Sequence, residues 1–304
     1  MGTVARVRVW GPDSVTCARA VNRGFEALHR ADSLMSTYRP DSDVSRLNGQ
    51  QPNRWVSVDP HTYRVIDRAV RIAADTDGAF DPTVLPLMRL WGFRGGLPRM
   101  PTAFAVDSAL VHVDYRKIEF DADDVRLRLG EGTAVDLGGI AKGYALELGE
   151  EGILSAGASA GTVDLGGNLI VFGPEANGPV AIQDPTRSDG TLGTIELEDA
   201  SVATSGGYER YVTIDGRRYG HILDPRNGRP VAGVASVTVV GRDAALVDAV
   251  ATAAYVMGVD DGLAFIASTE GIEGCVVWVD NGELRIEMTA GFREGFTRGG
   301  IELR

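Results

Sequence analysis

The chain has 304 residues, 44% of them hydrophobic and 24% charged, which is typical of one large globular domain or two closely associated ones. Its 30 basic and 42 acidic residues give a net charge of −12, which counts against a nucleic-acid partner, because a phosphate backbone binds to a basic surface. No stretch approaches the roughly 20 uncharged apolar residues of a membrane helix, so we expect no membrane span.

The first half of the chain predicts a strand, two long helices and a hairpin. Apolar and polar residues alternate over residues 3–10, which indicates a half-buried strand. Apolar residues recur at the spacing of one helix face over residues 14–33 and again over residues 61–76. After a loop rich in glycine and proline at residues 92–101, residues 117–130 alternate on both sides of a polar turn and predict a hairpin.

The second half combines strands with one helix. Strand-like runs occupy residues 236–240, 275–279 and 284–288, and we expect a helix over residues 244–257. Because helices and hairpins interleave without a regular βαβ rhythm, we expect an α+β fold with mixed sheets and packed helices. No linker-like stretch interrupts residues 1–304, so we expect a single compact domain, in which a repeated VDLGG motif leaves room for two related subdomains.

The first candidate site is the glycine-rich segment VDLGGIAKGYALE at residues 135–147, which reads as a strand, a turn and the start of a helix. Free backbone N–H groups at such a helix start can hold a phosphate, with Lys142 as a point charge and Asp136 as a polar anchor. Lys142 is one of only two lysines in a chain that otherwise uses arginine. The alternative that stays open is a tight turn with a solvated lysine.

The second candidate is a pair of oxygen ligands on the helix expected over residues 244–257. Asp248 and Thr252 are four residues apart and share a helix face, where a carboxylate and a hydroxyl suit Mg²⁺. Cys17 and Cys275 are far apart and outside any CxxC motif, so we expect neither a thiolate metal site nor a disulfide. In the alternative, Thr252 bonds to a helix carbonyl and Asp248 pairs with an arginine. The apolar surroundings of Asp248 indicate that it has a partner in either case.

The third candidate is His221, which precedes the turn-forming sequence DPRNG at residues 224–228. A histidine held between a strand end and a rigid turn is well placed for acid–base catalysis. A structural role, in which His221 holds the hairpin, stays open.

Two further segments have ligand-binding and structural interpretations. The sequence DGAFDPTV at residues 77–84 is expected to expose backbone around Phe80, which suits a stacking or ligand-edge site or else a helix cap. The sequence SVATSGGYERY at residues 201–211 could wrap closely around a ligand or form a polar turn.

In their order along the chain, these segments resemble the ApbE family, the FAD:protein FMN transferases. The resemblance runs from the first residue to about Gly258 and rests on seven motifs. These are MGT at 1–3, MSTYRPDSDVSRLN at 35–48, DGAFDPTVLPLMRLWGF at 77–93, VDLGGIAKGYA at 135–145, SVATSGGYERY at 201–211, HILDPRNGRP at 221–230 and DAVAT at 248–252.

The resemblance implies a specific activity. Enzymes of this family divide FAD and attach its FMN half, through a phosphoester, to a threonine or serine of a target flavoprotein, with release of AMP. It also implies site residues in this chain, with His221 as the catalytic histidine. The residues implied to contact FAD are Met1, Tyr38, Ala79, Phe80, Asp81, Asp136 and Lys142. The Mg²⁺ ligands implied are Asp248, Thr252 and the backbone carbonyl of Gly139.

Several points stay open. His221 is suited to act as a general base or to form a transient phosphoryl adduct. The same site could use water and act as an FAD pyrophosphatase that yields FMN and AMP, or the chain could bind FAD without catalysis. Many members of the family carry an export signal before the MGT motif, so we expect either a cytoplasmic protein or a chain trimmed of such a signal.

Overall fold

The fold is described here from a computed structural model, which describes residues 2–187, 189–207 and 210–299. The chain packs into two compact units. Unit 1 holds residues 31–141 and 210–231 together with Gly207, and unit 2 holds residues 2–30, 142–206 and 232–299. Helices and sheets are mixed along the chain, which confirms the α+β prediction, whereas a single domain over residues 1–304 stays a prediction.

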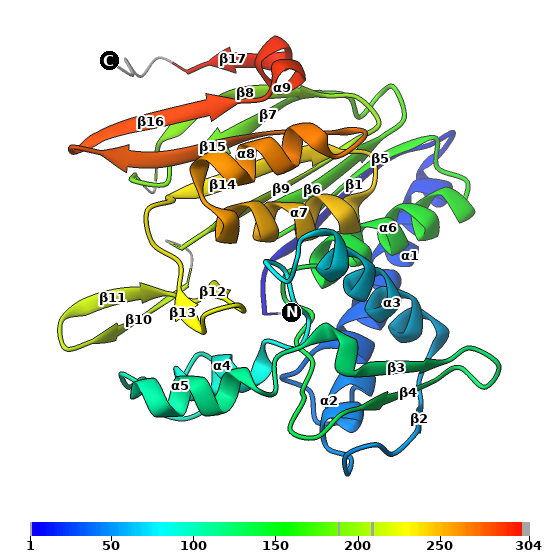
Figure 1. The fold of residues 1–304 in the computed structure, drawn as a ribbon. Coiled ribbons are helices and arrows are strands. Elements are labelled where there is room, and N and C mark those ends of the chain that lie inside the picture. Colours follow the sequence, from blue (N-terminus) through cyan, green and yellow to red (C-terminus); the bar gives the residue numbers. More distant parts are fainter. Residues whose placement is uncertain (1, 188, 208–209, 300–304) are drawn as a thin grey trace. The chain divides into compact units, whose positions relative to one another are not determined.

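Unit 2 is built on a seven-stranded antiparallel sheet (Figure 1). In spatial order its strands are β1 (Ala5–Trp10), β5 (Ala160–Leu165), β6 (Asn168–Phe172), β9 (Ser201–Gly206), β14 (Ser236–Gly241), β15 (Ile272–Asp280) and β16 (Glu283–Met288). The strands expected over residues 3–10, 236–240, 275–279 and 284–288 are all present. The segment at 201–211, interpreted as a ligand wrap or polar turn, begins instead with β9 near the middle of the sheet.

Helices cover one face of this sheet and a smaller sheet packs on the other. Helices α7 (Ala244–Met257) and α8 (Val259–Ser268) lie over β9, β14 and β15, and most of α1 (Ser14–Met35) and α6 (Ala141–Ser155) also belongs to this unit. The smaller sheet runs in the order β17 (Phe296–Arg298), β8 (Thr191–Leu197), β7 (Gly178–Gln183), beside α9 (Ala290–Gly295). Val171, Val202 and Val277 of the large sheet share a buried core with Leu192 and Ile195 of β8.

Unit 1 contains short helices and small sheets. Its helices are α2 (Asp43–Asn48), α3 (Pro60–Asp75), α4 (Leu85–Leu90) and α5 (Ala103–Leu110), with a 3-10 turn at Tyr115–Lys117. Strands β2 (Val56–Ser57), β4 (Arg126–Leu129) and β3 (Ile118–Asp121) form one sheet, which contains the expected hairpin. Two further hairpins pair β10 (Tyr211–Ile214) with β11 (Arg217–Gly220) and β12 (Leu223–Asp224) with β13 (Arg229–Pro230).

Local sequence explains several boundaries. The α3 helix begins with the Asp59 side chain accepting a hydrogen bond from the His61 N–H group, and with proline at its first position. The turn between β10 and β11 places Asp215 and Gly216 at φ values of 49° and 77°, the left-handed pair of a tight hairpin. Within the described residues, no helix is long and apolar enough to cross a membrane.

The glycine-rich segment differs from its prediction at the start. Residues 135–137 are not in a strand, and the only pairing there is an isolated parallel bridge between Ala134 and Val84. A turn at residues 138–140 then leads directly into α6, as expected. The Asn48 side chain replaces the missing sheet bonds, because it accepts from the Val135 N–H group at 2.7 Å and donates to the Val135 carbonyl at 2.7 Å.

Candidate functional site

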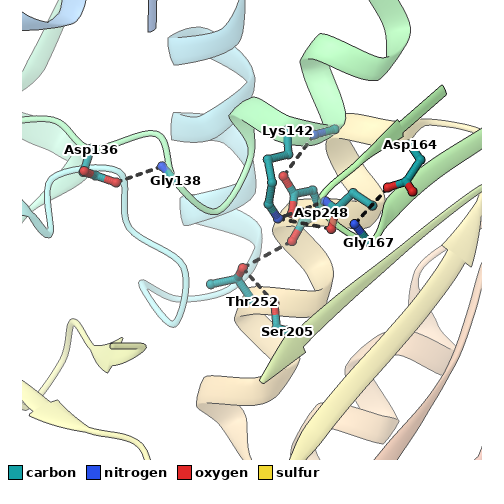
Figure 2. A network of polar contacts seen from close by, with 10 residues as sticks. Asp136, Gly138, Lys142, Asp164, Gly167, Ser205, Asp248 and Thr252 are labelled. Atoms are coloured by element: carbon teal, nitrogen blue, oxygen red, sulfur yellow. Dashed lines mark hydrogen bonds and ion pairs between the residues drawn. The ribbon is translucent and has the colours of Figure 1, made fainter. Parts of the chain in front are cut away.

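The polar centre of unit 2 is the carboxylate of Asp248, on the α7 helix. Its side chain is almost fully buried, with 2% of the residue exposed. The Oδ1 atom accepts hydrogen bonds from Asn168 Nδ2 at 2.8 Å and from Lys142 Nζ at 3.3 Å (Figure 2). The Oδ2 atom accepts the backbone N–H group of Gly143 at 3.0 Å. Because Gly143 lies in the first turn of α6, Asp248 also satisfies an N–H group that has no partner within its own helix.

Lys142 is fixed by this network rather than solvated. Its ammonium contacts Asp248 Oδ1 and also donates to Asn168 Oδ1 at 3.1 Å. The Asn168 side chain is buried and bridges the other two residues, since its amide nitrogen donates to Asp248. The lysine side chain nevertheless remains about a quarter exposed. An ammonium held in one place with its charge in reach of solvent is suited to a phosphate ligand.

The close packing of α6 against α7 requires glycine at position 143. A Cβ atom there would lie 2.0 Å from the carbonyl oxygen of Ala244 and 2.8 Å from the Cα atom of Ala245. The absence of a side chain thus lets the start of α6 approach α7 closely enough for the Gly143 N–H group to reach Asp248.

Thr252 lies one helical turn after Asp248. Its hydroxyl is 3.3 Å from the Asp248 carbonyl oxygen and 3.2 Å from the hydroxyl of Ser205, on β9. Thr252 thus bonds to a helix carbonyl, as the alternative interpretation expected. Asp248 has a partner, as expected, but the cation beside it is Lys142 and not an arginine.

The oxygen chemistry of this cluster fits Mg²⁺. Across the described parts of the chain, no three His, Cys, Asp or Glu side chains are grouped in a way that could hold a metal ion. A metal site here would therefore combine the Asp248 carboxylate with neutral oxygens, which are ligands that Mg²⁺ accepts. A carboxylate offers about four acceptor positions, and protein donors use three of those of Asp248.

In unit 1, Asp136 is the polar anchor of the turn that precedes α6. Its Oδ2 atom accepts hydrogen bonds from Arg94 Nε at 3.0 Å and from the Thr37 hydroxyl at 3.1 Å, and it forms an ion pair with Arg94 Nη2 at 2.9 Å. Among the residues that the structure describes, its Oδ1 atom accepts from the backbone N–H group of Gly138 alone, at 2.8 Å (Figure 2). The Arg94 guanidinium also lies over the ring of Tyr38, 4.1 Å from its centroid. Three separate segments of unit 1 thus meet at Asp136.

The segment at residues 79–81 is buried, and the Phe80 ring is not exposed for stacking on a ligand. Ala79, Phe80 and Asp81 are at most 7% exposed. The Asp81 carboxylate accepts hydrogen bonds from the N–H and hydroxyl groups of Thr83 and from the N–H group of Tyr115. Desolvation by burial raises the pKa of Asp81, and the hydrogen bonds from Thr83 and Tyr115 counteract this. Any ligand contact at these positions would use the backbone.

His221 lies between β11 and β12, as its position before the turn suggested. Its ring Nδ1 atom is 3.1 Å from the carbonyl oxygen of Arg210, and its N–H group bonds to the same oxygen. Because a carbonyl can only accept, this contact places the proton on Nδ1 and, in the neutral ring, the lone pair on Nε2. The turn after His221 is rigid: Asp224 accepts from the Arg226 and Asn227 side chains, and the Trp91 indole donates to the Gly228 carbonyl at 2.9 Å.

Of the remaining implied residues, Met1 lies outside the described residues, and Gly139 lies in the turn before α6. Residues that the sequence reasoning missed are Asn168 and Ser205 in unit 2 and Thr37 and Arg94 in unit 1. Asn168 directly follows the second VDLGG motif, which was a signal for it, and Thr37 is adjacent to Tyr38 in the MSTYRP motif. Arg94 had no signal apart from the glycine-rich loop that contains it.

Comparisons with known proteins agree over most of the chain. A model of the ApbE family matches residues 1–276. A protein of Treponema pallidum named FAD:protein FMN transferase is 30% identical over 96% of this chain and 85% of its own length, and one of Vibrio cholerae is 33% identical over 89% and 82%. The solved ApbE protein of Thermotoga maritima superposes with a TM-score of 0.88 at 37% identity, covering 98% of this chain and 97% of its own. The apo form of the flavinyl transferase ApbE of Pseudomonas stutzeri gives 0.85 at 31%, over 98% and 95%.

Proposed function

The chain belongs to the ApbE family, and we propose that it is an FAD:protein FMN transferase that attaches FMN to a threonine or serine of a target flavoprotein and releases AMP. The observation that carries the proposal is the Lys142 ammonium, held between Asp248 and Asn168 at the start of α6. Such a fixed cation suits a substrate whose reacting group is a pyrophosphate. The names of the relatives support FAD as the donor.

The proposed reaction is a substitution at phosphorus. The acceptor hydroxyl oxygen attacks the phosphorus atom that carries the riboflavin moiety, and the bond from that phosphorus to the bridging oxygen breaks. AMP leaves with the bridging oxygen, and FMN remains attached to the protein through a phosphoester. The proton of the hydroxyl is taken up by a base and passes to solvent. Lys142 offsets negative charge on the phosphate oxygens throughout.

His221 is the proposed base. With Nδ1–H donating to the Arg210 carbonyl, the neutral ring presents the lone pair of Nε2. A neutral imidazole with such a lone pair can remove the proton of a hydroxyl as the new bond forms. Formation of a transient phosphoryl adduct on His221 is the alternative, which a burst of AMP release without acceptor would reveal.

The proposed metal ligands are Asp248, Thr252 and the Gly139 carbonyl. Mg²⁺ bound by them would neutralise charge on the pyrophosphate oxygens. Asp248 suits this role because its buried carboxylate is held in place by the Lys142 ammonium, the Asn168 amide and the Gly143 N–H group. The proposed FAD contacts remain Met1, Tyr38, the backbone of 79–81, Asp136 and Lys142. A cytoplasmic location stays a prediction.

The experiment that tests the proposal measures AMP release from FAD with and without a candidate acceptor flavoprotein, in Mg²⁺ and in excess chelator. We expect AMP release that requires both Mg²⁺ and the acceptor. Release of FMN and AMP at the same rate without acceptor would identify an FAD pyrophosphatase instead. Intact FAD that stays bound in every mixture would identify a non-catalytic binding protein.

A further inference from the structure

Arg94 connects two of the residues that are proposed to contact FAD. Its guanidinium donates a hydrogen bond from Nε to Asp136 Oδ2, forms an ion pair with the same oxygen through Nη2, and lies 4.1 Å from the centroid of the Tyr38 ring. Asp136 belongs to the turn before α6, and Tyr38 belongs to the segment between α1 and α2. Arg94 itself lies in the glycine-rich loop after α4, whose backbone is tied to that helix by hydrogen bonds from Phe93 and Arg94 to the Met88 carbonyl.

After its contacts within the protein, the Asp136 carboxylate can still accept a hydrogen bond at Oδ1. Oδ2 already accepts two hydrogen bonds, from Arg94 Nε and from the Thr37 hydroxyl, and is paired with Arg94 Nη2. Within the described part of the chain, Oδ1 accepts one donor, the Gly138 N–H group, and therefore has capacity for one more. Because the charge of the carboxylate is offset by Arg94, the group that suits Oδ1 is a neutral N–H or O–H donor, such as a ring N–H, an amino group or a sugar hydroxyl, and not a phosphate.

Tyr38 complements this acceptor. Its side chain is among the exposed large hydrophobic residues, with 60% of the residue accessible. Arg94 packs against one face of the ring and holds it by a cation–π contact. The exposed surface of the ring is thus available for stacking on a planar ring of a nucleotide.

The Arg94 guanidinium is held by its contacts to Asp136 and Tyr38. Its side chain is 13% exposed, and among the described residues its Nη1 atom is buried with no hydrogen-bond partner. The contacts that hold the guanidinium are therefore the pair with Asp136 and the ring of Tyr38.

We propose that Arg94 is a positioning residue for FAD, which holds the Tyr38 ring and the Asp136 Oδ1 acceptor in place for one ring system of the dinucleotide and its neutral donors. The inference rests on the proposed function, since it assumes that FAD is the ligand. A planar guanidinium is needed because it stacks on the tyrosine while two of its nitrogens contact the carboxylate, whereas an ammonium can only pair with the charge.

Three variants test the inference through FAD affinity, measured by titration of flavin fluorescence, and melting temperature. In Arg94→Lys we expect a melting temperature close to that of the wild type, because the pair with Asp136 persists, but an FAD dissociation constant about tenfold higher. Arg94→Met should lower the melting temperature as well, because it leaves a buried carboxylate unpaired. Arg89→Met, at an exposed arginine in α4, is the matched control and should bind FAD as the wild type does.

A double-mutant cycle shows whether Arg94 acts through Tyr38. We expect Arg94→Lys to raise the dissociation constant by less than about threefold in a Tyr38→Leu background, because contacting residues are not additive. In steady-state kinetics Arg94→Lys should raise the KM for FAD and change kcat little. Separate titrations with AMP and FMN show which ring system Tyr38 and Asp136 receive, since only one half should be sensitive to Arg94→Lys.

The outcomes separate the inference from the proposed function. A wild-type protein that neither binds FAD nor releases AMP would overturn the proposed function. A wild-type protein that binds and turns over FAD, with Arg94→Lys binding FAD equally well, would overturn the inference alone and leave Arg94 as a structural residue. Arg94→Lys decides the question if Arg94→Met fails to fold.

Discussion

The Lys142 ammonium lies 3.3 Å from the Oδ1 atom of Asp248, and the same carboxylate accepts the N–H group of the next residue, Gly143. The buried Asp248 carboxylate thereby holds both the Lys142 ammonium, which is proposed to bind the pyrophosphate, and the first turn of α6. A change at Asp248 should affect both, whereas a change at Thr252 should affect only an oxygen ligand.

Replacement of Asp248 should therefore be far more harmful than replacement of Thr252. We expect Asp248→Ala to abolish Mg²⁺-dependent cleavage of FAD, because it removes the only charged ligand. Thr252→Ala should retain measurable activity and require more Mg²⁺. Asp260→Ala, at an exposed acid in α8, controls for the loss of a negative charge. Activity of Asp248→Ala equal to that of the wild type, with or without chelator, would exclude the proposed metal site.

Position 143 should not tolerate even a methyl group. Gly143→Ala places a Cβ atom 2.0 Å from the Ala244 carbonyl oxygen, so α6 and α7 must separate. We expect a loss of about 1–3 kcal/mol of unfolding free energy, together with reduced FAD cleavage because Lys142 shifts with the helix start.

Gly149→Ala is the matched control in the same helix. A Cβ atom there would contact Val163 at 3.5 Å, an ordinary distance, and alanine favours the helix by up to about 1 kcal/mol. Denaturant unfolding of both variants gives the comparison. Equal stability of the two would show that the close approach of α6 and α7 is not required.

Loss of the His221 imidazole should separate binding from catalysis. In His221→Ala we expect FAD and Mg²⁺ to bind as before and transfer to fall by a factor of about 10²–10⁴, the usual cost of removing a general base. If His221 only holds the hairpin, the variant should melt earlier and yet transfer FMN at the wild-type rate below its melting point. Transfer rate and melting temperature measured on the same sample decide between these roles.

The buried thiol of Cys275 should make stability depend on alkaline pH. Burial within β15 raises the pKa of Cys275 from 9.0 to about 12. The protonated thiol is favoured in the folded chain, so this contribution is complete below pH 9 and is lost as the pH rises from 9 towards 12. The loss is at most about 1.4 kcal/mol per pH unit. Unfolding free energies of the wild type and Cys275→Ala across this range should differ in slope, and parallel curves would contradict the shift.

Local features of the fold could be predicted from sequence. The helices at Ser14–Met35 and Pro60–Asp75 have regular apolar faces, and an Asp-Gly pair determines the turn between β10 and β11. The hydroxyl-rich strand β9 could not be predicted, because its polar residues are satisfied across the sheet. Thr204, for example, bonds to the hydroxyl of Thr238 at 2.9 Å.

Some residues of the candidate site could likewise be identified from sequence, and others could not. The motifs identified Asp248, Lys142 and His221 as candidates, because each lies in a short pattern with chemical meaning, and their functional roles stay predictions. Arg94 could not be found from the sequence, and Asn168 had only the repeated VDLGG motif as a signal, since their partners are distant in the chain: Asn168 bonds to Asp248 and Arg94 to Asp136. The burial of Phe80 could not be predicted from the sequence either, because the surrounding Asp-Gly and Asp-Pro pairs are typical of exposed turns.

The most direct test of the central claim is the intact mass of a candidate acceptor flavoprotein after incubation with this protein, FAD and Mg²⁺. We expect a gain equal to one FMN less one water, located by fragmentation on a threonine or serine, and absent with Asp248→Ala. An acceptor of unchanged mass in a mixture where FAD has been converted to FMN and AMP would contradict the transferase assignment.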